Sequence, residues 1–179
     1  MRIVGGDLGG RRIKPPAKMP YTRPTTDIAK EGLFNIIANN LDITALKTCD
    51  LFGGTGSISY ELSSRGARDC TIVEKDPAMF EFITKTSKEL KLENFHPVKM
   101  DVFRFISQCT DKFDLIFAGP PYALATIDEL PVKIFAQEMV AANGWFILEH
   151  TPRNNYTGAP HFVTARNYGT TIFSIFVNK

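Results

Sequence analysis

The sequence predicts an α/β fold in which a mostly parallel β-sheet carries helices on both faces. Short apolar runs and amphipathic stretches alternate from residue 46 to residue 150, which is typical of right-handed βαβ units. Glycine and proline residues punctuate these segments at turn positions. The chain has 179 residues, of which 44% are hydrophobic. That is enough for one domain whose core needs no disulfide or metal to stabilise it.

The first 24 residues are predicted to form a basic β-hairpin arm with an extended connector, outside a main domain at 25–179. In "MRIVGGDLGGRRIKPP", two glycine pairs lie between apolar and basic residues, a pattern that favours a short hairpin. Three prolines between residues 15 and 20 favour extended chain. Next, "RPTTDIAKEGLFNIIANNL" places turn residues before apolar residues at helical spacing, so we expect an amphipathic helix over 28–41.

The remaining elements are expected to follow in alternation. The expected strands are 46–54, 69–76, 96–101, 113–119 and 144–150, and the expected helices are 57–66, 77–90, 102–109 and 127–140. Gly66 suits a helix C-cap, and Pro77 suits the first position of a helix. The last two expected strands, 162–169 and 170–178, have no helix between them. They should therefore form a hairpin, in which one strand runs antiparallel to its neighbour.

Positive charge is concentrated near the N-terminus. Residues 1–30 contain seven Lys and Arg against two Asp, a net charge of +5, while the remaining residues carry −3 because the whole chain carries +2. A basic segment attached to a mildly acidic body favours a polyanionic partner. A solvated, functionally neutral terminus is the alternative interpretation.

Several classes of protein are disfavoured. No apolar run approaches the roughly 20 residues of a membrane span, and the N-terminus lacks the apolar core of a signal peptide. We therefore expect a soluble, cytoplasmic protein without a membrane partner. The cysteines and histidines show no metal-binding spacing, so neither a metal site nor a disulfide is expected. These residues are Cys49, Cys70, Cys109, His96, His150 and His161.

Acidic residues and glycines follow three successive expected strands. "CDLFGGTGS" places Asp50 before a glycine-rich turn into a helix, where the backbone can approach a ligand closely. Glu74 follows the second strand and could accept both hydroxyls of a ribose, and Asp101 follows the third and could accept from an exocyclic amine such as that of adenine. The set indicates a nucleoside ligand. The GxGxxG spacing and the P-loop lysine are absent, which disfavours a pyrophosphate and therefore a nicotinamide dehydrogenase.

The fourth of these strands ends abruptly in "FDLIFAGPPYALA". Pro120 and Pro121 cannot donate hydrogen bonds to a sheet, so the strand ends there and the backbone becomes rigid. Rigid prolines fix carbonyl acceptors, and Tyr122 offers a flat face for stacking. A planar base flipped out of its helix or loop would fit such a slot.

With these residues in place, the chain resembles a known family. The blocks "RIVGGDLGGRRI", "RPTTDIAKEGLFNII", "DLFGGTGSISYELSSRGA", "VEKD" and "PPY" are similar, in order from Arg2 through Tyr122, to bacterial 16S ribosomal RNA guanine-N2 methyltransferases of the RsmD type. The resemblance implies a Rossmann-like class I methyltransferase with seven strands, the last antiparallel, that uses S-adenosylmethionine. It also implies methylation of the exocyclic N2 amine of a guanine in 16S ribosomal RNA, within an assembling 30S subunit, by a monomeric protein.

The resemblance also implies roles for individual residues, and no metal among them. For the cofactor site it implies Asp50, Phe52, Gly53, Gly54, Gly56, Glu74, Lys75, Asp101 and Val102. For the catalytic motif it implies Gly119, Pro120, Pro121 and Tyr122. The basic residues expected to hold RNA phosphates are Arg2, Arg11, Arg12, Lys14 and Arg23.

Two positions depart from the family pattern. "FGG" at residues 52–54 replaces the more usual Phe-Ala-Gly, which is a conservative change. The second departure is the more serious. Gly119 stands where the family has Asp or Asn before Pro-Pro-Tyr, so a side-chain acceptor for the target amine is missing. Loss of one preorganised electrostatic partner typically slows a reaction about 10²- to 10³-fold, so transfer should be impaired unless another group replaces it. Two alternatives stay open: a non-catalytic RNA-binding or ribosome-assembly protein on a degenerate methyltransferase fold, and an adenine-N6 nucleic-acid methyltransferase, since the same motif also serves the amine of adenine.

Overall fold

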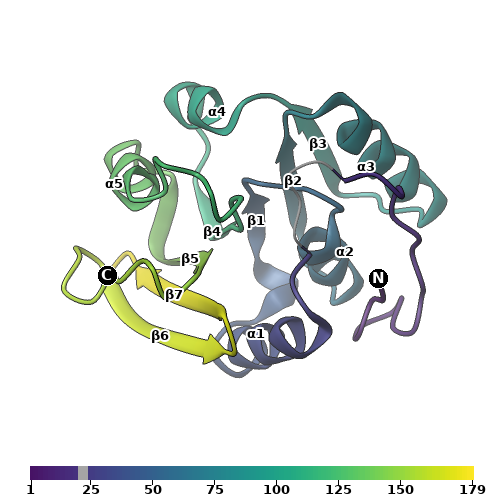
Figure 1. Ribbon diagram of the computed structural model, residues 1–179. Helices are drawn as coiled ribbons and strands as arrows, with labels where there is room; N and C mark the ends of the chain where they lie inside the picture. The colour runs from purple at the N-terminus through teal and green to yellow at the C-terminus, as the bar shows by residue number, and fades with distance from the viewer. Residues whose placement is uncertain (20–23) are drawn as a thin grey trace.

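A seven-stranded sheet forms the centre of the computed structural model, which describes residues 1–19 and 24–179 (Figure 1). The strands are β1 (Lys47–Asp50), β2 (Asp69–Glu74), β3 (Phe95–Lys99), β4 (Phe113–Ala118), β5 (Val140–His150), β6 (Phe162–Tyr168) and β7 (Thr171–Val177). Their order across the sheet is β3-β2-β1-β4-β5-β7-β6. The first five strands pair in parallel, whereas β7 is antiparallel to both β5 and β6. The predicted mixed sheet with an antiparallel last strand is therefore confirmed.

Three of the five described α-helices begin directly after a residue whose side chain caps the helix. The helices are α1 (Asp27–Asn40), α2 (Ser57–Ser64), α3 (Pro77–Glu89), α4 (Val102–Gln108) and α5 (Glu129–Ala136), with a short 3₁₀ helix at Ile43–Ala45, and the three capped ones are α1, α3 and α4. The Thr26 hydroxyl accepts a hydrogen bond from the Ala29 amide at the start of α1, and the Asp76 carboxylate accepts from the Met79 amide at the start of α3. None of these helices, in the part of the chain that the structure describes, could span a membrane.

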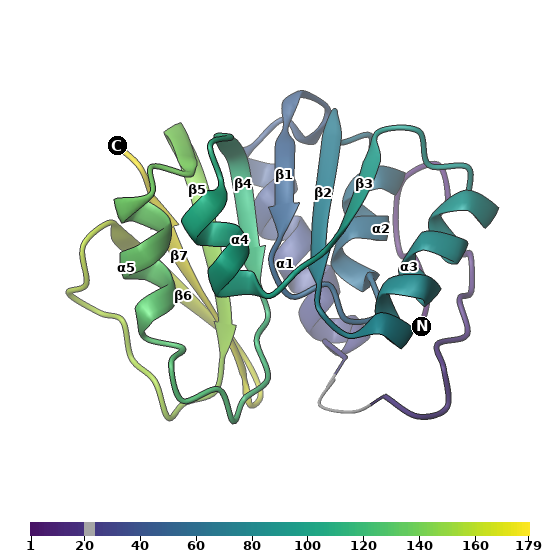
Figure 2. The same ribbon diagram turned by 90° about the horizontal axis from the view of Figure 1, so that it is seen from above.

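Two apolar layers bury the sheet. One layer joins α1, α2 and α3 to one face, and includes the fully buried Phe34, Tyr60 and Ile83. The other joins α4 and α5 to the opposite face, and includes Ile106 and Ile134. Figure 2 shows α4 and α5 in front of the sheet and α1 behind it. Because both faces are covered, the carboxyl ends of the parallel strands form one of the few edges open to a ligand.

Several boundaries differ from the sequence-based expectation: β1 ends at Asp50 rather than at residue 54, and α5 and β5 are both displaced. We expected a helix over 127–140 followed by a strand from residue 144, but α5 ends at Ala136 and β5 already begins at Val140. The chain turns at Glu138, whose φ of 56° is left-handed, and Val140 then pairs with Phe113. Strand pairing with β4 therefore overrides the helical spacing of the apolar residues in this segment.

The N-terminal segment folds against the body, and the predicted two-stranded hairpin is not confirmed. Residues 1–13 turn back on themselves, but the described structure has only one antiparallel bridge there, between Arg2 and Arg12. Ile3 and Ile13 are 1% and 8% exposed and belong to the same apolar layer as α1 and α2. The predicted boundary after residue 24 stays a prediction, and residues 20–23 of the connector lie outside the described residues.

A buried ion pair attaches this segment to the helices. The Lys30 ammonium of α1 lies 3.5 Å from the Glu61 carboxylate of α2, and both side chains are at most 2% exposed. Glu61 also accepts hydrogen bonds from the backbone amides of Val4 and Gly5, at 2.9 and 2.8 Å. Burial lowers the pKa of Lys30, although the nearby Glu61 opposes that shift. The path of the N-terminal segment therefore depends on an ion pair whose two members lie in different helices, α1 and α2.

Candidate active site

A cavity of about 850 Å³ opens at the carboxyl ends of the parallel strands. Its position follows from the strand order, because β1 and β4 are neighbours and the chain runs outward from them in both directions. Such a switch point leaves a crevice between the loops that follow the strands. Of the predicted cofactor residues, those that line it are Phe52, Gly54, Glu74, Lys75, Asp101 and Val102. The predicted catalytic residues, 119–122, line it as well.

The glycine turn that follows β1 contributes Gly54 to the cavity wall. Gly54 and Gly56 both have left-handed φ values, 54° and 85°, which only glycine adopts without strain. A Cβ at Gly56 would also lie 2.4 Å from the Tyr60 ring. Gly53 and Gly56 are not part of the cavity wall. Gly56 lets the chain turn into α2, whereas Gly53 leaves room for Ile72, whose Cγ1 would lie 2.7 Å from a Cβ there.

Asp50 lies beneath this turn rather than on the wall. Its side chain is buried, and one carboxylate oxygen, Oδ2, accepts a hydrogen bond from the Ser59 hydroxyl at 3.1 Å. The other oxygen, Oδ1, is buried and has no hydrogen-bond partner among the described residues. Burial raises the pKa of Asp50 to about 8. A buried carboxylate oxygen without a hydrogen-bond partner is unfavourable for stability, and Asp50 lies behind the cavity wall rather than in it.

Glu74 and Asp101 each have a structural partner in addition to facing the cavity. The Glu74 carboxylate accepts from the Gly54 amide at 2.7 Å and from the Asp76 amide at 2.9 Å, so it ties the glycine turn to the end of β2. Asp101 caps α4 by accepting from the amides of residues 103 and 104. A carboxylate oxygen can accept more than one hydrogen bond. Both residues therefore retain acceptor capacity toward a ligand.

Glu149 is a cavity residue that the sequence analysis did not select. It lies near the end of β5, is 4% exposed, and lines the cavity together with Gly119 and Tyr122. The Tyr122 hydroxyl donates to Glu149 Oε1 at 3.2 Å, and the Thr25 hydroxyl donates to Oε2 at 2.7 Å. The reasoning applied to Glu74, an acidic residue at the carboxyl end of a parallel strand, would also have found Glu149 in "GWFILEH".

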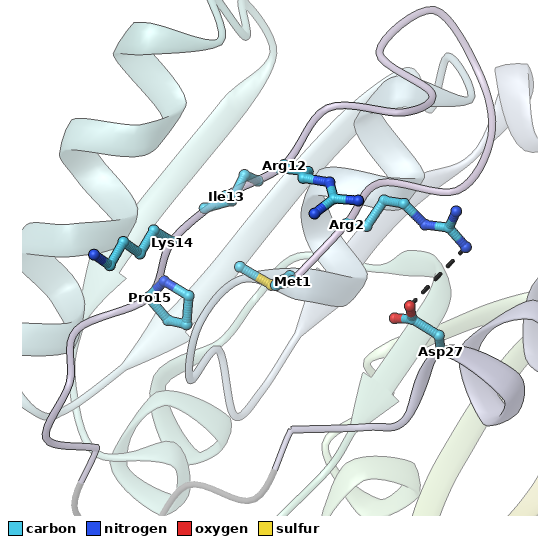
Figure 3. Close-up of a pocket in the computed structure, with 7 residues that line it drawn as sticks. All are labelled: Met1, Arg2, Arg12, Ile13, Lys14, Pro15 and Asp27. Carbon is cyan, nitrogen blue, oxygen red and sulfur yellow. Dashed lines mark ion pairs between the residues drawn. The ribbon is translucent and has the colours of Figure 1, made fainter.

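Three of the predicted RNA-binding residues line a separate groove of about 670 Å³ (Figure 3). Arg2 and Arg12 come from the two bridged segments of the N-terminus, and Lys14 follows them. All three side chains are exposed, as is that of Arg11, which does not line the groove. Arg23 lies outside the described residues.

The charge of this groove is partly compensated. The Arg2 guanidinium lies 4.0 Å from the Asp27 carboxylate, as the dashed line in Figure 3 marks, and 3.8 Å from that of Glu31. Residues 25–27 connect the two sites, because Thr25 contacts Glu149 in the cavity while Asp27 lines the basic groove. The groove and the cavity are thus adjacent through the start of α1.

The described residues contain no group of three or more His, Cys, Asp or Glu that could hold a metal ion. All three cysteines are buried and free. His150 is buried and bonded to the Thr151 carbonyl and the Ser174 hydroxyl, and burial lowers its pKa. These groups pack the protein interior in the described structure.

Comparison with known proteins assigns the family. The family model described as "Conserved hypothetical protein 95" matches residues 1–177. The ribosomal RNA small subunit methyltransferase D of Escherichia coli (strain K12) is 31% identical over 145 residues, which cover 81% of this chain and 69% of that protein. The chain belongs to this methyltransferase D family. The family resemblance read from the sequence blocks is thereby confirmed.

Solved structures agree with this assignment. The fold of yhhF from Escherichia coli matches with a TM-score of 0.88 at 25% identity, covering 100% of this chain and 98% of that one. SMU.776, a structure complexed with SAH, matches with a TM-score of 0.66 at 16% identity, covering 83% of this chain and 49% of that one. At that identity the second match shows a shared Rossmann-like fold, which is the fold class predicted from the sequence.

Proposed function

We propose that this protein transfers a methyl group from S-adenosylmethionine to the exocyclic N2 amine of a guanine in small-subunit ribosomal RNA. The observation that carries the proposal is one cavity in which Glu74 and Asp101 face the rigid segment 119–122, in a chain of the methyltransferase D family. The fold supplies the adjacency, because parallel strands bring the loops that follow them to a single edge.

The cavity fits the cofactor in size and in the type of group it presents. A volume of about 850 Å³ lies within the usual range for small-molecule sites. Glu74 suits the ribose hydroxyls, and Asp101 suits the adenine amine. When bound, S-adenosylmethionine supplies an electrophilic methyl group on a sulfonium.

The segment 119–122 is suited to the target base. Pro120 is buried and Pro121 is exposed. Their rings fix φ, so their carbonyls are rigidly placed acceptors, and the Pro121 carbonyl accepts a hydrogen bond from the Leu124 amide at 2.9 Å. Tyr122 is half-buried at the cavity wall and its hydroxyl is tied to Glu149. Its ring is therefore held in one orientation and can stack on a flipped base. Holding the amine in line with the methyl is the main catalytic task of such a slot.

The basic groove would hold the RNA backbone beside this slot. Arg12 and Lys14 are exposed and have no ion pair among the described residues, whereas Arg2 shares its charge with Asp27 and Glu31. Phosphate contacts of this kind fix register and orientation without reading bases. If about four basic residues contact phosphates, the slope of log affinity against log salt should be about −3 to −4.

The decisive experiment measures methyl transfer and maps its position. The purified protein is incubated with labelled S-adenosylmethionine and 30S subunits or free 16S ribosomal RNA from cells that lack the corresponding gene. We expect one labelled guanine, methylated at N2, and no label with the Tyr122→Ala variant, whose binding of S-adenosylhomocysteine should persist by calorimetry. Label on adenine N6 would assign the adenine alternative instead.

Gly119 favours one further candidate, a non-catalytic RNA-binding protein on the same fold. The same measurements separate the two functions. Binding of RNA without affinity for S-adenosylhomocysteine, and without transfer to any RNA, would support the non-catalytic function. The buried Asp50 and the acidic cavity wall argue against it, because a protein that only binds RNA gains nothing from them.

A further inference from the structure

The space beside Gly119 is not open. A Cβ built on Gly119 would lie 3.2 Å from Glu149 Oε2 and 3.1 Å from Cε1 of Phe117. Both distances are tighter than most contacts of a real Cβ, so an Asp or Asn side chain would compete with the Glu149 carboxylate for the same volume. An acceptor oxygen from β5 therefore lies beside the place where a side chain at position 119 would begin.

The Glu149 carboxylate is held in place from two sides. The Thr25 hydroxyl, just before α1, donates to Oε2, and the Tyr122 hydroxyl, just after the two prolines, donates to Oε1. The side chain is also packed, since only 4% of the residue is exposed, yet it lines the cavity. An acceptor whose orientation is fixed in this way does not need to reorganise during a reaction.

We propose that Glu149 is the side-chain acceptor for the target amine, in the place that Gly119 leaves vacant. The inference rests on the proposed function and adds a catalytic residue to it. In the transfer, the amine lone pair forms the new N–C bond while the electron pair of the S–C bond stays on the departing sulfur. The nitrogen gains positive charge and then gives up one proton. Glu149 accepts a hydrogen bond from that amine and receives the proton, which it passes to water.

The electrostatics favour this role. A guanine amine is a weak nucleophile because its lone pair is delocalised into the ring, and the charge that develops on nitrogen must be stabilised. A carboxylate that is itself shielded from solvent, as Glu149 is, stabilises such a charge far more than it would in bulk water. Asp50 cannot do this, because it is buried beneath the glycine turn and does not line the cavity. Glu149 lines the cavity beside the proposed base slot.

The first test is Glu149→Gln, which keeps the shape of the side chain but removes its charge. We expect kcat for methyl transfer to 16S ribosomal RNA to fall about 10²-fold or more. KM for the RNA and the dissociation constant for S-adenosylhomocysteine should change by less than about threefold, which is under 1 kcal/mol. Glu93→Gln, an exposed glutamate away from the cavity, is the matched control.

The second test moves the carboxylate to the other side of the same space. Glu149→Ala should be as slow as Glu149→Gln, and Gly119→Asp added to Glu149→Ala should restore at least about a tenfold rate, since the truncated residue makes room. Gly119→Asp alone should not exceed the wild-type rate, because it brings two carboxylates together in one small volume. This pair of variants remains informative even if the glutamine variant folds poorly.

The outcomes separate the inference from the function on which it depends. A wild-type protein that methylates no RNA would overturn both. An active wild-type protein with a folded Glu149→Gln variant of unchanged kcat would overturn the role of Glu149 and leave the proposed function intact. A folded double variant as slow as Glu149→Ala would refute the claim that a carboxylate at position 119 or at position 149 can act as the acceptor for the same amine.

Discussion

Removing the charge of Glu61 tests whether the buried ion pair determines the stability of the fold. Glu61 is fully buried, lies 3.5 Å from the equally buried Lys30 ammonium, and accepts backbone hydrogen bonds from Val4 and Gly5. Breaking a buried pair by removing one partner costs about 3–5 kcal/mol, since the remaining charge is uncompensated. We therefore expect Glu61→Gln to lower the free energy of unfolding by that amount. For a domain of this size the midpoint of thermal unfolding should fall by about 6–20 °C.

The measurement is urea unfolding at 25 °C followed by circular dichroism, with calorimetry for the midpoint. The matched control is Glu89→Gln, which removes one partner of the exposed pair Lys85–Glu89, where the side chains are 75% and 64% exposed. That change should cost less than about 1 kcal/mol. Amide hydrogen exchange at Val4 and Gly5 should also accelerate in Glu61→Gln and stay unchanged in the control.

The pH dependence of the free energy of unfolding distinguishes the loss of the Glu61 charge from a loss of packing at that position. The pKa of Lys30 is lowered by burial, and without Glu61 it should fall further. In the variant the unfolded chain then binds more protons than the folded chain at neutral pH, so stability rises with pH until the unfolded lysine titrates near about pH 10. The deficit of Glu61→Gln should therefore shrink between pH 7 and 10. A variant within 1 kcal/mol of the wild type at pH 7, with an unchanged denaturant slope, would refute the reasoning.

Three further predictions concern the two candidate sites. Burial raises the pKa of Asp50 to about 8, whereas an Asp in the unfolded chain has a pKa of about 4. Between these two values the folded protein holds a proton that the unfolded chain has released, so the free energy of unfolding falls as the pH rises toward 8. Asp50→Asn should therefore stabilise the ligand-free protein more at pH 8.5 than at pH 5, and an equal shift in melting temperature at both values would contradict this. Glu74→Ala removes an acceptor that also anchors the Gly54 amide, and should weaken binding of S-adenosylhomocysteine at least about tenfold by calorimetry; unchanged affinity would exclude a cofactor role. Arg12→Ala and Lys14→Ala should each flatten the salt slope of RNA binding by about one unit, and a slope that stays the same would remove the groove from the RNA interface.

Much of the candidate site could be predicted because its residues obey rules local to the sequence. Asp50, Glu74 and Asp101 each follow an apolar run that ends at a turn, and parallel strands gather such positions at one edge. The segment 119–122 can be recognised in the sequence because it contains two prolines, which end a strand. The same rules place the capping residues, since Thr26 and Asp76 act within three residues along the chain.

Other features could not be predicted, because they depend on contacts between distant residues. The expected two-stranded hairpin is not confirmed: one bridge joins Arg2 and Arg12, while Ile3 and Ile13 pack against the helices, a burial that local turn signals do not specify. Lys30 was counted as part of a basic arm, yet it is buried against Glu61. The position of Lys30 in α1 indicates which face of the helix carries it, but not that Glu61 of α2 lies against that face.

By itself the sequence determined the succession of strands and helices along the chain, the edge of the sheet at which acidic residues meet, and the rigid segment 119–122 that ends a strand. Each of these follows from the spacing of neighbouring residues. Only the tertiary structure decided that Glu149 stands beside Gly119, held by Thr25 and Tyr122. Those residues come from the start of α1, the end of β4 and the end of β5 and are up to 124 positions apart. No local pattern encodes such a meeting, because it arises only when the strands pair into the sheet and the side chains at its edge pack into one volume.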